Sequence, residues 1–341
     1  MQALFPTPRR AAGFSLAEMM ISMAIGLIIL AGMATLFVNN NRTADEVEKA
    51  NRQLETGRFA LQTLSIDARN AGYYAEFDPI NMGLPPSLPL PCSTDLTVIE
   101  AALPLVVQGY DNYASTMSTT LSCLTGVKIG TDVLVIRRTQ TCALGVGNCE
   151  AASAGGIFLQ ASMCNGATEL QSTDVANHFD IGTATTDLTR TMRNCTAAAP
   201  MYRLVTHIYY IGSDNVTGDG IPTLKRAELG GTTLGFTIVP LAEGVENMQL
   251  EYGMDSDAST DLDVAPDSFS SSPATLEDWR DVVSVRISLL ARNLTATPTH
   301  IDSKSYKLGS TAVAAANDHY KRHVFESLVS LPNPSGRKMP Q

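Results

Sequence analysis

The apolar positions near the start of the chain predict one long helix with two different halves. From Phe14 to Val38 the sequence is apolar, with a single ionisable side chain, Glu18. At ~1.5 Å per residue such a helix spans roughly 37 Å, which is enough to cross a bilayer. Beyond it, apolar residues recur at spacings of three and four, which predicts an amphipathic helix with one core-facing stripe: Val47, Ala50, Leu54, Gly57, Leu61, Leu64, Ala68 and Ala71. Since no proline interrupts residues 14–74, we expect one continuous helix that stops near Gly72.

The second half of the chain alternates with a period of two, which predicts strands. A β-branched run already marks residues 131–138, and the later strands are expected at residues 203–211, 223–229, 234–241, 247–252, 283–289 and 324–331. Gly230 and Gly231 lie between the runs 223–229 and 234–241 and predict a hairpin. Because few helical stretches separate the strands, they favour an antiparallel sheet.

Two regions lack a clear period. Prolines crowd residues 78–105, which we interpret as an irregular loop and not a helix. Residues 139–200 are rich in Ala, Thr, Gly and Asn and contain Cys142, Cys149, Cys164 and Cys195. We interpret this stretch as an insertion that disulfides hold on the sheet.

Charge and cysteine content indicate the cellular compartment and the kinds of partner. The chain has 341 residues and a net charge of −10, and it would reach −12 without Arg9 and Arg10, so it is a poor candidate for wrapping nucleic acid. Those two arginines precede the apolar span, so the positive-inside rule places the N-terminus in the cytoplasm and the bulk of the chain outside. Six cysteines suit disulfides on that oxidising side. Six cysteines allow 15 connectivities, and the nearest-neighbour choice is Cys92–Cys123, Cys142–Cys149 and Cys164–Cys195.

The apolar span itself has three interpretations. A secretory signal has a core of ~7–15 residues followed by a small-residue cleavage site, and this span is longer and poorly matched. A plain membrane anchor fits the length but leaves Glu18 unexplained, since a charge in hydrocarbon costs on the order of 2.5–3.5 kcal/mol and usually has a partner. The third interpretation is a signal cut before the span, so that the helix stays on the mature protein.

The third interpretation matches a known family. Residues 13–18, Gly-Phe-Ser-Leu-Ala-Glu, resemble the type IV prepilin recognition site. The resemblance implies that a prepilin peptidase cuts between Gly13 and Phe14 and methylates the new amine on Phe14. Glu18 would then pair with the Phe14 ammonium in the growing filament. Residues 57–73, residues 244–253, Trp279 and residues 283–292 also resemble PilW-like minor pilins of the type IV pilus.

That family implies an α+β pilin fold: a long N-terminal helix, transmembrane in its first half, packed on an antiparallel β-sheet head with a disulfide-bearing insertion. We divide the chain accordingly into six parts. The first three are a leader (1–13), a transmembrane and filament-core helix (14–38) and its amphipathic continuation (39–74). The head then comprises a loop with the first strands (75–138), a cysteine-rich insertion (139–200) and a sheet core (201–341).

The function implied is that of a minor pilin in the tip or priming complex, assembled from the bacterial inner membrane with its head in the periplasm. The implied partners are other minor and major pilins, the prepilin peptidase, the inner-membrane assembly platform and membrane lipid. A minor pseudopilin of a type II secretion system remains an alternative, and so does a membrane-tethered binding protein or hydrolase.

Candidate chemistry outside the signal is sparse. Asp255, Asp257, Ser259, Asp261 and Asp263 alternate like the first ligands of a calcium loop, but Thr260 and Pro266 replace the turn glycine and the last glutamate. We therefore expect no cofactor other than possible calcium at the four aspartates. His319 and His323 are four apart, but a strand there would separate their side chains. His178, His207 and His300 look isolated, and no catalytic motif is visible, so we expect no enzyme.

Overall fold

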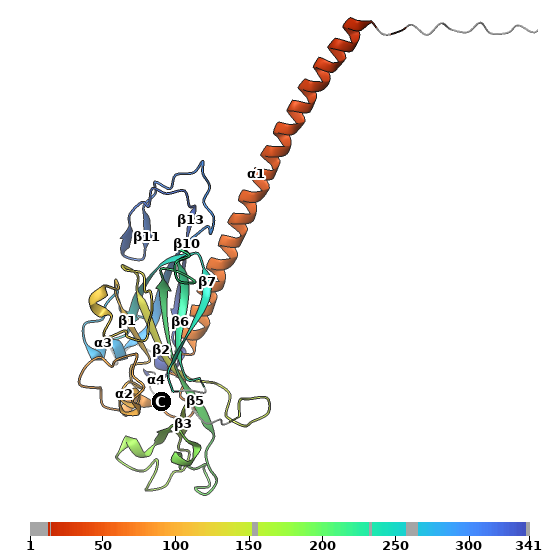
Figure 1. Cartoon of the computed structure of the whole chain (residues 1–341). Coiled ribbons are helices and arrows are strands. Elements are labelled where there is room, and N and C mark those ends of the chain that lie inside the picture. Colours follow the sequence, from red (N-terminus) through yellow and green to blue (C-terminus); the bar gives the residue numbers. More distant parts are fainter. Residues whose placement is uncertain (1–12, 14, 152–155, 232–233, 257–264, 339–341) are drawn as a thin grey trace, which may run out of the picture. The chain divides into compact units, whose positions relative to one another are not determined.

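The structure is a computed structural model of the whole chain, and it describes residues 13, 15–151, 156–231, 234–256 and 265–338 (Figure 1). The chain divides into two units, Met1–Asn51 and Arg52–Gln341, and each is described by itself. We call the second unit the head.

The predicted continuous helix is confirmed. Helix α1 runs over Leu16–Arg69, and the chain then turns through Gly72, whose φ of +72° suits glycine. In its head portion, α1 buries Gly57, Ala60, Leu64 and Ala68 at spacings of three and four. This is the later part of the stripe that the sequence predicts, and its small residues let the helix backbone approach the sheets; Val47 and Ala50, its first predicted members, are exposed.

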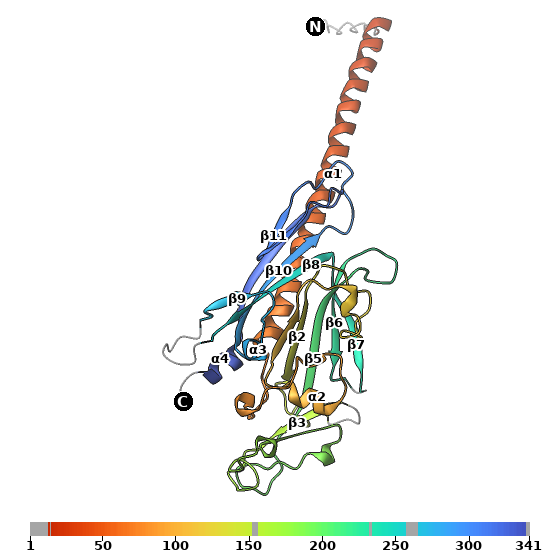
Figure 2. The same ribbon diagram turned by 90° about the vertical axis from the view of Figure 1, so that its left-hand side faces the viewer.

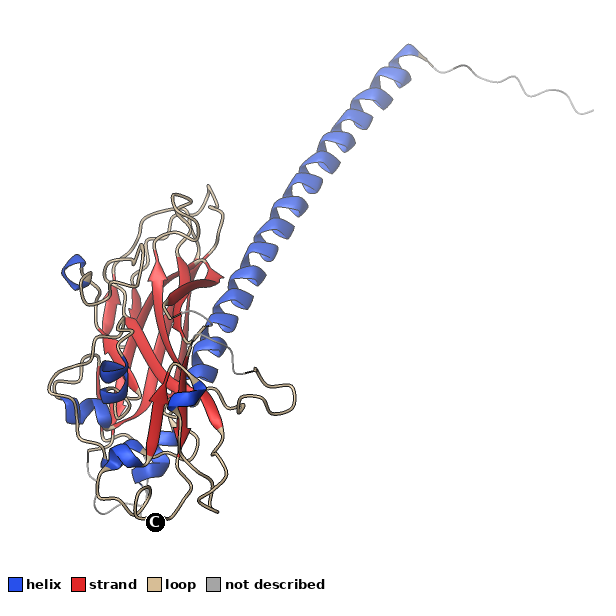
Figure 3. Cartoon of the chain, turned by 60° about the horizontal axis from the view of Figure 1, so that its bottom comes forward, coloured by secondary structure: helices blue, strands red, loops and turns tan. Residues whose placement is uncertain are grey.

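Strands dominate the head, and the helices other than α1 are short (Figure 3). In the described residues one sheet has seven strands in the order β1-β2-β5-β3-β4, with β6 pairing β5 and β7. Their bounds are β1 Val107–Tyr110, β2 Val133–Thr139, β3 Ile157–Ala161, β4 Phe179–Gly182, β5 Met201–Gly212, β6 Thr223–Leu229 and β7 Phe236–Glu243. The β6–β7 pair is the hairpin predicted around Gly230 and Gly231.

The remaining strands build a second sheet, which corrects the expectation of one. In the described residues its order is β13-β10-β8-β9, with a separate β11–β12 hairpin (Figure 2). The bounds are β8 Val245–Met254, β9 Ser268–Ser270, β10 Val282–Arg292, β11 Tyr306–Leu308, β12 Thr311–Val313 and β13 Arg322–Ser330. All pairings are antiparallel, as predicted. The alternation on β10 suggested a half-buried strand, but even Ser284 and Ser288 are buried there, because β10 lies between β8 and β13.

Residues 78–105 are not wholly irregular, which corrects a second expectation. Helix α2, Leu96–Ala101, begins after Asp95, whose side chain accepts from the Thr97 N–H as an N-cap. The other short helices are η1 Pro79–Asn81, η2 Ser115–Met117, η3 Val175–Asn177, η4 Thr185–Asp187, α3 Leu276–Arg280 and α4 Pro332–Lys338.

One hydrophobic core serves the helix and both sheets. It joins Leu64 of α1 with residues such as Leu134 and Tyr209 of the larger sheet and Leu250 and Ile287 of the smaller one. Asp132 links the two sheets directly: its N–H donates to the Met248 carbonyl and its carboxylate accepts from the Leu250 N–H. The two sheets are therefore joined by a shared hydrophobic core and by the hydrogen bonds of Asp132.

Candidate functional site

The N-terminal end of α1 has a built cap. The Ser15 N–H donates to Glu18 Oε2 at 2.9 Å, and the Glu18 N–H donates to Ser15 Oγ at 3.2 Å. This reciprocal pair is a capping box, and its Ser-x-x-Glu signature was readable in the sequence but was missed. Gly13 is exposed with open space around it, whereas Phe14, predicted as the new N-terminus, lies outside the described residues. Glu18 thus has a role in the helix end even before any partner is considered.

The apolar half of α1 is suited to lipid. Every side chain from Leu16 to Val38 is exposed, and the helix is long and apolar enough to cross a membrane. Its polar groups are satisfied within the helix: Ser22 Oγ donates to the Glu18 carbonyl at 2.7 Å, and Thr35 Oγ1 donates to the Gly32 carbonyl at 2.8 Å. Internal satisfaction is what hydrocarbon demands of a spanning segment. This supports membrane anchoring through α1.

At the other end of α1, Asp67 ties the helix to the larger sheet. It is 5% exposed and accepts three hydrogen bonds: from Arg138 Nε at 2.7 Å, from His207 Nδ1 at 2.6 Å and from the Tyr209 hydroxyl at 2.8 Å. Since a carboxylate only accepts, the His207 Nδ1 carries the proton. The far ring nitrogen of His207 lies 3.9 Å from a carboxylate oxygen of Glu228 on β6. We call these five residues the Asp67 cluster.

The electrostatics of the Asp67 cluster favour a charged histidine. Burial lowers the pKa of His207, but its hydrogen bond to Asp67, the nearby carboxylate of Glu228 and the charge of Asp67 outweigh burial and raise that pKa. The nearby His207 ring in turn lowers the pKa of Glu228 to about 2. The interpretation of His207 as isolated was wrong, because Asp67 lies 140 residues away and no local signal announces the contact.

The stripe of α1 also meets the smaller sheet closely. A Cβ built on Gly57 would lie 2.1 Å from the Phe325 ring of β13, so only glycine fits there. Gln53 donates from Nε2 to the Ala291 carbonyl of β10 at 2.7 Å and to the Lys321 carbonyl at 3.0 Å. The helix is thereby fixed to both sheets by side chains of its head portion.

The cysteines pair as the nearest-neighbour choice predicted, and this is confirmed for Cys92–Cys123, Cys142–Cys149 and Cys164–Cys195. The last two pairs lie in the predicted insertion, 139–200. That insertion is less separate than expected, because its β3 pairs with both β4 and β5 of the larger sheet.

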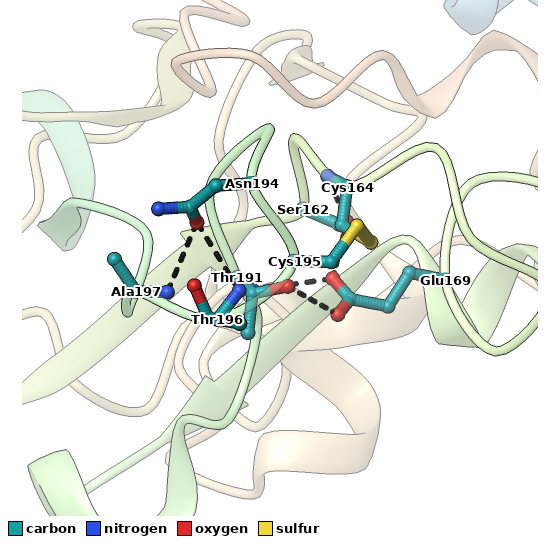
Figure 4. Close-up of a disulfide and its surroundings, with 8 residues drawn as sticks. All are labelled: Ser162, Cys164, Glu169, Thr191, Asn194, Cys195, Thr196 and Ala197. Carbon is teal, nitrogen blue, oxygen red and sulfur yellow. Dashed lines mark hydrogen bonds between the residues drawn. A yellow bond between two sulfur atoms is a disulfide. The ribbon is translucent and has the colours of Figure 1, made fainter.

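Side chains reinforce the disulfides of the insertion. Around Cys164–Cys195, Asn194 Oδ1 accepts from the backbone N–H groups of Thr196 and Ala197, and Glu169 accepts from Thr191 (Figure 4). Beside the Cys142–Cys149 loop, the buried Arg203 of β5 donates two hydrogen bonds to Glu150, at 2.8 and 2.9 Å. These contacts order the insertion on the sheet.

The other candidates are not brought together. Of the four calcium aspartates, only Asp255 lies within the described residues, and its N–H donates to the Asp281 carbonyl. His319 Nδ1 lies 2.6 Å from the His300 carbonyl, whereas His323 on β13 packs its ring on Phe325. Among the described residues no group of three or more His, Cys, Asp or Glu is placed to hold a metal.

Two parts of the chain, one at the N-terminal helix and one in the head, are similar to known protein families. Residues 8–34 match the family model of the prokaryotic N-terminal methylation motif, and residues 208–333 match that of type IV pilus-assembly protein W. No curated protein sequence is detectably similar to the chain. One similar solved structure is a type IV-like pilin from Thermus thermophilus, with 14% identity over 64% of this chain and 94% of that one. Its TM-score of 0.29 is too low for any conclusion about the fold.

The matched residues contain the features described above. The methylation motif covers the capping box and most of the apolar span, and the W-family match covers the end of β5 and the strands from β6 to β13. This chain therefore carries a prokaryotic N-terminal methylation motif and a region similar to type IV pilus-assembly protein W, and it is a minor pilin of type IV pilus assembly.

Proposed function

We propose that this minor pilin is cut between Gly13 and Phe14, methylated on Phe14 and assembled into the tip or priming complex of the pilus. The observation that carries the proposal is an exposed, lipid-compatible helix with a capped Glu18 directly behind the cleavage motif. A carboxylate near the start of a helix is favourable there and available to a neighbouring ammonium group. The new amine of Phe14 would supply that ammonium.

The orientation and partners follow from the same segment. By the positive-inside rule, Arg9 and Arg10 before the span support a cytoplasmic leader and a periplasmic head, before the chain enters the extracellular pilus. The partners are then the prepilin peptidase, other minor and major pilins, the inner-membrane assembly platform and lipid. We propose no nucleic-acid partner, given the net charge of −10, and no enzymatic activity.

The test compares three variants of the capping box in cells that assemble pili. Glu18→Ala removes both the cap and the charge, Glu18→Gln keeps a hydrogen-bonding cap without the charge, and Ser15→Ala removes the other half of the box. We expect all three to be cut and methylated, as intact mass spectrometry would show. Only the two Glu18 variants should fail to enter pili, and Ser15→Ala should cost about 1 kcal/mol of local helix stability and still assemble.

Four results would contradict this proposal. An N-terminus at Met1, or a cut beyond the apolar span, would exclude prepilin processing. Normal incorporation of Glu18→Gln would show that assembly does not need the Glu18 charge, and absence of the native chain from pili would leave α1 as the tether of a membrane-anchored binding protein or hydrolase. Pili that persist in a gene deletion while exoprotein secretion fails would identify a type II secretion pseudopilin instead.

Calcium at Asp255, Asp257, Asp261 and Asp263 stays a prediction. The melting temperature of the full chain in detergent should rise on adding calcium and fall on adding a chelator if the loop binds the ion.

A further inference from the structure

Strand β13 forms one edge of the smaller sheet. Among the described residues it pairs only with β10, in a regular antiparallel register from Ser284↔Ser330 to Arg292↔Arg322. The Leu331 N–H donates to the Val283 carbonyl and the Asn293 N–H to the Lys321 carbonyl, so odd-numbered residues of β13 exchange hydrogen bonds with β10. The N–H and C=O groups of Val324, Glu326, Leu328 and Ser330 therefore point away from the sheet.

This edge lacks most of the features that protect exposed strands. Protective features include proline, bulges, several charges or a covering element. Over the nine residues of β13 the register has no bulge and the sequence has no proline, and two of its five outward-bonding residues, Arg322 at the start and Glu326, are charged. Leu328 is 53% exposed beside it. Four successive outward-bonding residues thus form an open ladder.

The chemistry of the edge specifies its occupant. Unpaired N–H and C=O groups at regular spacing are met by another extended strand, which adds to the sheet. Phe325 and Val329 form an apolar surface on the face of the sheet toward α1, and an added strand would continue that surface. Apolar residues should therefore occur at every second position of the added strand. The occupant is therefore an extended segment with apolar residues at every second position.

A second copy of this chain is the less suitable source. Antiparallel pairing of two β13 strands relates the copies by a two-fold axis perpendicular to the sheet. That axis reverses any direction in the sheet plane, including that of the head portion of α1 lying along it, whereas subunits assembled in one filament share one polarity. Parallel self-pairing keeps the direction but gives a slightly weaker ladder.

We propose that β13 is a docking edge that takes up an extended strand from a different membrane-anchored pilin subunit of the same polarity. The inference rests on the proposed function, because it is pilus assembly that brings other pilin heads beside this one. It assigns the contact to backbone hydrogen bonds of Val324, Glu326, Leu328 and Ser330.

The first test is a cross-link in cells that assemble pili. The photoreactive residue p-benzoylphenylalanine replaces Leu328 on the edge or, as a matched control, Val216, which is 68% exposed in a loop after β5. We expect a several-fold higher yield of an adduct from the Leu328 position, which mass spectrometry identifies as another prepilin-type subunit joined through an extended segment. No adduct, or an adduct with a second copy of this chain, would overturn the proposal.

The second test removes one outward hydrogen bond. Leu328→Pro deletes an N–H that points away from β10, and Leu328→Thr makes a matched side-chain change that keeps it. We expect Leu328→Pro to lose pili at an unchanged melting temperature and Leu328→Thr to keep them. Pili in a folded Leu328→Pro variant would refute the edge, and if that variant does not fold, the cross-link decides. A gene deletion that leaves pili intact would refute the proposed function. If the deletion abolishes pili but cells with a folded Leu328→Pro variant still make them, only this inference is refuted.

Discussion

At Asp67 one carboxylate joins α1 to two strands of the larger sheet, through Arg138 on β2 and through His207 and Tyr209 on β5. Such a group is costly to bury alone and costly to leave without its partners. The single substitution with the largest effect on the helix–sheet junction should therefore fall here.

Asp67→Asn should lower the free energy of unfolding by roughly 3–5 kcal/mol, since it leaves a buried histidine and a half-buried arginine without their anion. Chemical unfolding of the full chain in detergent measures this loss. Glu326→Gln is the surface control, because its pair with Arg286 at 3.7 Å is exposed. It should change stability by less than about 1 kcal/mol.

The same cluster predicts a pH dependence. The pKa of His207 is raised in the folded state, so the protonated ring contributes stability that is complete below about pH 6.5. That contribution is lost as the pH rises through the raised pKa. Unfolding curves at pH 6 and pH 9 should show this decline in the native chain, and a decline of the same size in Asp67→Asn would contradict it.

Asp132 adds a second, separate pH window. Burial raises its pKa to about 7, even though it accepts hydrogen bonds from the Asn112 and Leu250 N–H groups, and its side chain is 1% exposed. The folded chain therefore holds a proton that the unfolded chain releases near pH 4, and stability should fall between about pH 4 and pH 7 by on the order of 4 kcal/mol.

Asp132→Asn tests this because the amide cannot titrate. It should cost about 1–3 kcal/mol at pH 4, since its NH₂ group faces a backbone N–H, but the decline between about pH 4 and pH 7 should disappear. Stability curves that remain parallel to those of the native chain would rule out Asp132 as the titrating group.

At the scale of elements, the contact between α1 and β13 depends on one missing side chain. Gly57→Ala should destabilise the head by roughly 1–3 kcal/mol, because the new Cβ would overlap the Phe325 ring, although alanine favours a helix by about 1 kcal/mol. Phe325→Leu in the Gly57→Ala background should recover part of the loss. The melting temperatures of the native chain, the two single variants and the double variant give the coupling between Gly57 and Phe325. Additive effects of the two substitutions would show that the new Cβ does not press on the ring.

At the scale of the whole molecule, disulfides fasten an insertion that a strand already joins to the sheet. The pairs Cys164–Cys195 and Cys142–Cys149 span 31 and 7 residues. Replacing each pair with serines should cost about 4 and about 2 kcal/mol, in the order of the loops they close. Hydrogen exchange should then rise in residues 162–200 for the first pair while β5–β6 stays protected; loss of protection across the whole larger sheet would show that the insertion supports the head.

Most elements were predictable because their signals are local. The continuous helix and its buried stripe, the β6–β7 hairpin and strands such as β10 and β13 are each set by residues within one element. Helix α2 was missed because prolines around it outweighed the Asp95 cap, and β3 because its five residues are buried on both faces and show no alternation. Glu18 was found as a charge in an apolar run, but its bond to Ser15 was not.

The sequence by itself determined the membrane-compatible helix, the cleavage motif before it, the location of most strands and, by proximity, the disulfide pairs. Only the tertiary structure decided that the strands form two sheets, that His207 lies on Asp67, and that β13 is left at an edge. The reason is physical: a period of two fixes which side chains of a strand are buried but not which strand lies beside it. Contacts between residues more than a hundred positions apart, such as Asp67 with His207, depend on that neighbour choice and leave no pattern in either segment alone.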